Sequence, residues 1–103
     1  MIKHIVLLEF KPSATSEEIT HLFFKLSILQ GHISSVRSFS YGQNTSPEQL
    51  NKGFNHAFIM EFENTASRDA YLAHPEHKNV AQQVIFPLLR RGKDSIIVLD
   101  YEF

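Results

Sequence analysis

The strand and the broken helix between residues 53 and 77 constrain the fold more than any other part of the chain. The strand alternates, so that His56 shares one face with apolar side chains at every second position. Pro75 breaks the helical stretch that follows, because the residue before a proline avoids the helical conformation. Tyr71 precedes this break and His77 follows it. If helices cover this face of the strand, the sequence predicts that His56, Tyr71 and His77 meet over one apolar surface.

Hydrophobic periodicity places the other elements on either side of this stretch. Strands are expected over residues 2–10, 36–41, 55–63 and 95–103, and helices over residues 15–31, 65–73 and from 75 to about 87, with a helical turn at 46–49. Thr15 and Glu18 have the spacing of a capping box, and His74 lies near the cap position of the helix after Pro75. The order β-α-β-β-α-α-β predicts one ferredoxin-like α+β domain over residues 1–103, with a four-stranded antiparallel sheet.

The first and last strands carry apolar side chains on both faces, although the helices of such a fold cover only one face. A second copy of the chain would cover the other face and close a dimeric α/β barrel. At about 25 cal/mol per Å², a standard interface of roughly 800 Å² per partner supplies ample driving force. The alternative is that tails or loops of the same chain cover this face. We expect the homodimer, because symmetric pairs are the commonest oligomers.

Composition excludes several classes of function. The chain has no cysteine, which excludes disulfide scaffolds, thiol catalysis and thiolate metal sites and fits a cytoplasmic protein. The net charge is −1, and Arg90, Arg91 and Lys93 form the one basic cluster. We interpret that cluster as the charged end of the last helix and expect no nucleic-acid partner. The sequence contains neither a signal-peptide pattern nor a stretch of transmembrane length, so we expect no membrane partner.

Several segments resemble the stress-responsive α/β-barrel (Dabb) proteins along the whole chain. The segments are Lys-His-Ile-Val-Leu at 3–7, Val-Arg-Ser-Phe at 36–39, Gly-Phe-Asn-His-Ala at 53–57, Tyr-Leu-Ala-His-Pro-Glu-His at 71–77 and Val-Leu-Asp-Tyr at 98–101. The most specific of them is the His-Pro-x-His that follows a tyrosine. The resemblance implies a ferredoxin-like dimer in which two sheets pack together.

The resemblance also implies a candidate site. Most of the family has no assigned activity, but one plant branch, olivetolic acid cyclase, closes a linear polyketide by an aldol condensation. By resemblance to that branch, Tyr71 and His77 would be the catalytic pair, and His4 and His56 would line the same pocket. The plant enzyme also uses a tyrosine on its first helix, and Leu26 occupies the matching position here.

The chemistry of these side chains agrees with an enolate-forming cyclase or lyase. Histidine titrates near neutral pH, so His77 can remove an acidic proton beside a carbonyl group. Tyr71 can orient that base or stabilise the enolate oxygen. This hypothesis predicts that a ring nitrogen of His77 lies within hydrogen-bond reach of Tyr71. It needs no cofactor, and the substrate would be a small, hydrophobic, polyketide-like carbonyl compound.

His4 and His56 would then be polar anchors of the substrate, and Phe23, Leu26 and Phe58 would contact its apolar part. Phe23 and Phe58 also suit the hydrophobic core. We expect no metal site, because no carboxylate completes a clear ligand set with the histidines. The alternative function is a non-catalytic, stress-related or ligand-binding homodimer in which the histidines are structural.

Overall fold

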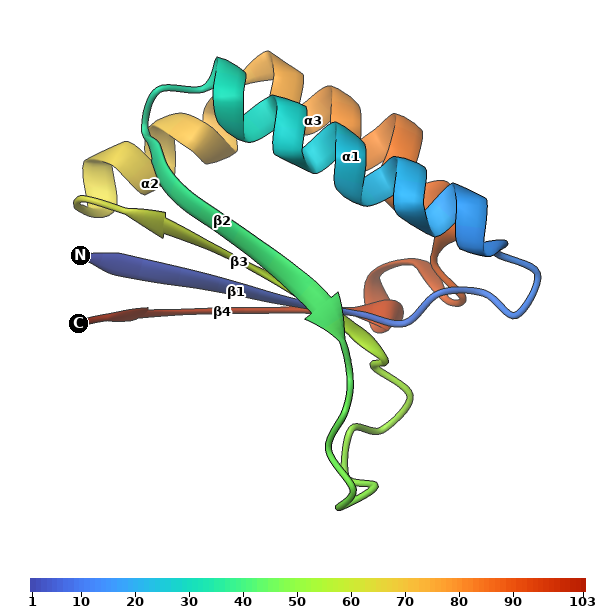
Figure 1. Cartoon of the computed structure of the whole chain (residues 1–103). Coiled ribbons are helices and arrows are strands. Elements are labelled where there is room, and N and C mark those ends of the chain that lie inside the picture. Colours follow the sequence, from blue (N-terminus) through green and yellow to red (C-terminus); the bar gives the residue numbers. More distant parts are fainter.

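A four-stranded antiparallel sheet carries all the helices on one of its faces in the computed structural model, which describes residues 1–103 (Figure 1). The strands are β1 (Ile2–Leu8), β2 (Val36–Gln43), β3 (His56–Phe62) and β4 (Ile96–Glu102), and the helices are α1 (Ser16–His32), α2 (Thr65–Ala73) and α3 (Pro75–Val80). The strand order is β2-β3-β1-β4. The predicted ferredoxin-like α+β fold is confirmed.

Local signals in the sequence fix the helix boundaries. Thr15 and Glu18 form the predicted capping box, in which the Glu18 backbone N–H donates to the Thr15 hydroxyl at 3.1 Å. The break at Pro75 also lies where it was predicted, with the His74 ring accepting a hydrogen bond from the Glu76 backbone N–H. Past Val80 the helix widens into a π-helical turn, Ala81–Ile85, and ends in a 3-10 turn, Phe86–Leu88, that contains Pro87.

The core lies between the sheet and the helices. Strand β1 lies in the middle of the sheet, and its alternate side chains Ile2, His4, Val6 and Leu8 are all buried against the helices. The register places His4 between Met60 of β3 and Asp100 of β4. His4 is therefore a polar ring within an apolar layer, with a carboxylate on the neighbouring strand.

The helix-free face and the edge strand β4 remain exposed in the single chain. Val98 and Leu99 point to opposite faces of β4 and are 55% and 56% exposed. The chain therefore leaves more than half of each of these two residues uncovered, one on each face of β4. The sequence-based expectation that this strand is buried on both faces is therefore not met within one chain.

Two smaller predictions are wrong. Residues 46–49 form a hydrogen-bonded turn and not a helical turn, and Gln49 adopts a left-handed conformation with φ of 59°. This turn belongs to the long β2–β3 loop, which extends away from the helices in Figure 1. The basic cluster does not end the last helix, because that helix stops at Leu88 and Lys93 lies in a separate 3-10 turn, Gly92–Ser95. Arg91 instead donates to the buried Glu9 carboxylate at 2.9 Å, and Arg90 lies 3.7 Å from it.

Candidate functional site

A cavity of about 300 Å³ opens between the helices and the β1–β4 side of the sheet. Most of its wall is apolar, and Val6, Leu26, Phe58, Ile85 and Val98 contribute to it. Four polar side chains interrupt this wall: His4 from β1, Tyr71 from α2, His77 from α3 and Asp100 from β4. An apolar pocket with a few convergent polar groups is the usual form of a small-molecule site.

Tyr71 is held by its ring and not by its hydroxyl. The side chain is 1% exposed, and its ring lies 5.3 Å from that of Phe62 and 4.5 Å from that of His77, measured between centroids. Burial alone raises the pKa of Tyr71 above its usual range, and the hydroxyl has no hydrogen-bond partner within the chain. The phenol therefore stays protonated and can donate to a group inside the cavity.

His77 presents one nitrogen for proton transfer. Its Nδ1 lies 3.2 Å from the backbone carbonyl oxygen of Leu72. A carbonyl oxygen can only accept, so Nδ1 carries the proton and Nε2 keeps its lone pair when the ring is neutral. Burial lowers the pKa of His77, and the bond to Leu72 opposes this shift only in part. His77 is thus a neutral base near pH 7.

No hydrogen bond joins His77 to Tyr71. The two rings are in contact at 4.5 Å and tilted by 50°, so the predicted proximity is present without the predicted hydrogen-bond reach. The His77 ring and the Tyr71 hydroxyl therefore both line the cavity, and no hydrogen bond links one to the other. Each is therefore free to contact a different atom of a bound molecule.

His4 is fixed by a carboxylate. Its Nδ1 lies 2.7 Å from Oδ1 of Asp100, and Arg68 donates through Nη1 to Oδ2 of the same carboxylate at 2.8 Å. The ring packs edge-on against Phe62 and Tyr71, at 6.1 and 6.2 Å between centroids. His4, Tyr71 and His77 therefore form one cluster at the end of the sheet where β1 begins.

His56 and Phe23 do not belong to this cluster, and the prediction that His56 meets Tyr71 and His77 is wrong. His56 faces the helices as expected, but it lies four residues along β3 from Met60, which pairs with His4. This separation is about 13 Å at the usual rise of a strand. His56 packs against Phe10 and Phe23, at 5.0 and 6.2 Å between ring centroids. Burial lowers the pKa of His56, and its Nδ1 is buried without a partner.

Leu26 and Phe58 do line the cavity, as predicted, whereas Phe23 stacks on Tyr41 of β2 at 4.5 Å between ring centroids. Asp100 and Arg68 were not predicted from the sequence. A carboxylate inside the apolar last strand was a usable signal for Asp100, since pairing β1 with β4 places it opposite His4. The position of Arg68 on α2 gave no such signal.

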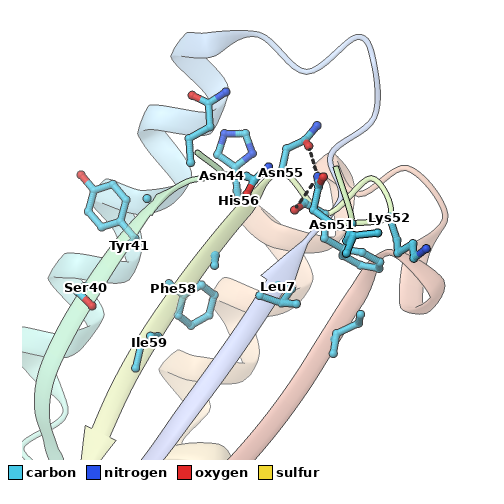
Figure 2. A pocket seen from close by; sticks show the side chains of 16 residues that line it. Leu7, Ser40, Tyr41, Asn44, Asn51, Lys52, Asn55, His56, Phe58 and Ile59 are labelled. Atoms are coloured by element: carbon cyan, nitrogen blue, oxygen red, sulfur yellow. Dashed lines mark hydrogen bonds between the residues drawn. The ribbon is translucent and has the colours of Figure 1, made fainter. Parts of the chain in front are cut away.

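A second hollow, of about 510 Å³, lies on the helix-free face beside the β2–β3 loop. Figure 2 shows Leu7 and Ile59 on its floor and the loop amides Asn51 and Asn55 at its rim. Asn51 donates to the Asn55 side-chain oxygen at 2.7 Å, which ties the rim together. None of His4, Tyr71 and His77 reaches this hollow, so it is separate from the site described above.

Two further features bear on function. No group of three His, Cys, Asp or Glu side chains is arranged to hold a metal ion. None of the helices combines the length and the apolar character needed to cross a membrane.

Comparison with known proteins identifies a family and several relatives that the chain resembles. A family model described as the stress responsive A/B barrel domain matches residues 2–103. The stress-response A/B barrel domain-containing protein HS1 of Arabidopsis thaliana is 31% identical over 101 residues, which are 98% of this chain and 88% of that protein. Olivetolic acid cyclase of Cannabis sativa is 21% identical over 100 residues, which are 97% and 94% of the two chains.

Solved structures agree in fold. A crystal structure described as a dimeric ferredoxin-like protein of unknown function from Jannaschia sp. CCS1 superposes with a TM-score of 0.87. It is 27% identical to this chain and covers 99% of it, while 98% of that protein is matched.

Proposed function

The chain belongs to the stress-responsive A/B barrel domain family, and from that premise we propose that its sheet–helix cavity binds a small apolar carbonyl compound and forms its enolate. One observation carries the proposal. The lone pair of a neutral His77 and the unpartnered hydroxyl of Tyr71 lie side by side on one apolar cavity. A volume of about 300 Å³ is at the lower end of ligand pockets, so the compound is small.

The reaction begins with a proton transfer. Nε2 of His77 removes a proton from the carbon beside a carbonyl group, the electron pair of that C–H bond forms the C=C bond of the enolate, and the π pair of the carbonyl group moves to its oxygen. Tyr71 donates its O–H hydrogen bond to the enolate oxygen as negative charge develops there. The enolate carbon can then attack a second carbonyl group of the same molecule, and the resulting alkoxide takes the proton back from His77. Proton transfer of this kind contributes typically 10²–10⁴-fold to a rate.

The apolar wall supports a substrate with a hydrocarbon portion. Leu26, Val6 and Phe58 surround the polar cluster and offer no hydrogen bond to a substrate. Similarity to olivetolic acid cyclase supports a carbonyl compound of polyketide type.

We also propose that the protein is a homodimer formed through the helix-free sheet face. The centre of that face is apolar and consists of Ile5, Leu7, Ile59, Ile97 and Leu99. The description of the Jannaschia protein as dimeric supports this assembly. A cytoplasmic location fits a chain without cysteine.

Deuterium exchange tests the proposal. Ethyl 3-oxooctanoate carries a β-dicarbonyl group on a short apolar chain, and proton NMR in D₂O follows the loss of the signal between its two carbonyl groups. A buffer slightly below pH 7 slows the uncatalysed reaction while His77 stays neutral, because burial lowers its pKa. We expect the wild-type protein to accelerate exchange, and the His77→Gln variant to lose the acceleration.

The control is His21→Gln, which removes an exposed imidazole on α1 outside the cavity. This variant should exchange at the wild-type rate. Equal acceleration by wild type and H77Q would contradict the proposal. Saturable binding of the ester without any acceleration would favour the non-catalytic ligand-binding alternative.

A further inference from the structure

The carboxylate of Asp100 joins two side chains from different elements. One oxygen accepts from Nδ1 of His4 at 2.7 Å, and the other accepts from Nη1 of Arg68 at 2.8 Å. The side chains of His4 and Asp100 are 5% and 18% exposed. Charge-assisted hydrogen bonds of this length, shielded from water, are the strong ones. Asp100 is therefore held at both oxygens and cannot turn away from the imidazole without breaking a second bond.

This carboxylate determines which ring nitrogen of His4 is left without a hydrogen bond inside the chain. A carboxylate only accepts hydrogen bonds, so Nδ1 of His4 carries a proton whether the ring is neutral or cationic. Nε2 is then the nitrogen that can gain or lose a proton, and it has no hydrogen-bond partner within the chain. Because His4 lines the same cavity as Tyr71 and His77, Nε2 is the ring nitrogen that it leaves for a molecule bound there.

Arg68 lies outside the cavity. Asp100 lines it and Arg68 does not. The guanidinium is also held from the other side, since Nε donates to Asp69 at 2.7 Å. Of the two side-chain hydrogen bonds that Arg68 makes, only the bond to Asp100 connects it to the cavity.

We propose that Arg68 is a positioning residue: acting through Asp100, it locks His4 in the tautomer with Nδ1 protonated and Nε2 free at the cavity. The lock is a property of the ligand-free protein. Only its catalytic use, as a second proton donor or acceptor beside His77, rests on the proposed function.

The test is nitrogen-15 NMR of the histidine rings in ligand-free protein at pH 8, with His4 assigned by its absence in a His4→Gln variant. Neutral imidazole gives distinct shifts for a protonated and an unprotonated nitrogen, so the spectrum reports the tautomer directly. We expect wild-type His4 to show one tautomer, with Nδ1 protonated. Arg68→Gln should lose this single pattern and give averaged shifts, because Asp100 is then free to rotate.

The matched control is Asp69→Asn, which weakens the other contact of Arg68 but leaves the bond to Asp100. It should keep the wild-type His4 spectrum, and Arg68→Lys should restore the pattern in part because a cation remains. An unchanged His4 spectrum in R68Q would overturn the proposal, and so would an equal change in D69N. If R68Q does not fold, Asp100→Asn tests the same lock, because the asparagine amide can donate a hydrogen bond as well as accept one. A His4 spectrum that keeps the single Nδ1-protonated pattern in D100N would count against the proposal.

These outcomes are independent of enzyme activity. A wild-type protein that fails to exchange the ester would refute the enolate mechanism and leave the tautomer lock standing. A wild-type protein that exchanges the ester while R68Q keeps the wild-type tautomer would do the reverse.

Discussion

Replacing Tyr71 by phenylalanine distinguishes a catalytic role of the Tyr71 hydroxyl from a role in the stability of the protein. The substitution removes only the hydroxyl and keeps the ring, which is 1% exposed and packed against Phe62 and His77. The hydroxyl makes no hydrogen bond within the chain, so its removal breaks none. We therefore expect the free energy of unfolding to fall by less than the roughly 1 kcal/mol that a typical hydrogen bond contributes.

The effect on catalysis should be much larger. Loss of one hydrogen-bond donor to a developing oxyanion typically costs about 10²–10³-fold in rate, or about 2.7–4 kcal/mol. Urea denaturation would measure the first quantity and deuterium exchange of ethyl 3-oxooctanoate the second. Tyr71→Ala is the contrasting variant, because deleting the buried ring should cost about 3–5 kcal/mol of stability. A Y71F variant that loses about 2 kcal/mol of stability would show that the hydroxyl is structural, and one that exchanges the ester at the wild-type rate would show that it is not catalytic.

Three other predictions follow from the structure. Because burial lowers the pKa of His77 from its ordinary 6.5, exchange should be fully present at neutral pH and should be lost only as the pH falls through that lowered value; a rate that halves above pH 6.5 would argue against His77 as the base. Gly53→Ala should destabilise the protein by about 1–2 kcal/mol in urea denaturation, because Gly53 has φ of +88° and an added Cβ would lie 2.7 Å from the Glu9 carboxylate. Gly31→Ala is its control, since a Cβ there meets nothing and the helix should gain up to about 1 kcal/mol. Leu99→Lys should convert the dimer to a monomer in light scattering after gel filtration, and a wild-type protein that is already monomeric would refute the assembly.

The fold was predictable because its signals are local. The capping box at Thr15 and the proline break after His74 fixed helix boundaries, and strand alternation fixed which side chains face the helices. The turn at 46–49 was misread because a serine followed by proline suits a helix start and a tight turn equally well.

The cavity was predictable only in part. Alternation assigned His56 to the correct face, but it gives no position along the strand relative to Tyr71, and that position depends on how α2 and α3 dock on the sheet. The pairing of Asp100 with His4 depends on the β1–β4 register, which tertiary packing sets. Arg68 reaches Asp100 only because α2 lies beside the end of β4 in space, 32 residues away in sequence.

Locating a bound ligand would show whether the sheet–helix cavity is the functional site. Ethyl 3-oxooctanoate titrated into nitrogen-15-labelled protein shifts the signals of the residues that surround it. We expect saturable shifts at four residues that line the sheet–helix cavity: His4, Tyr71, His77 and Val98. Shifts confined to Ser40, Asn55 and Ile97, around the hollow on the helix-free face, would contradict it, and so would the absence of any saturable shift.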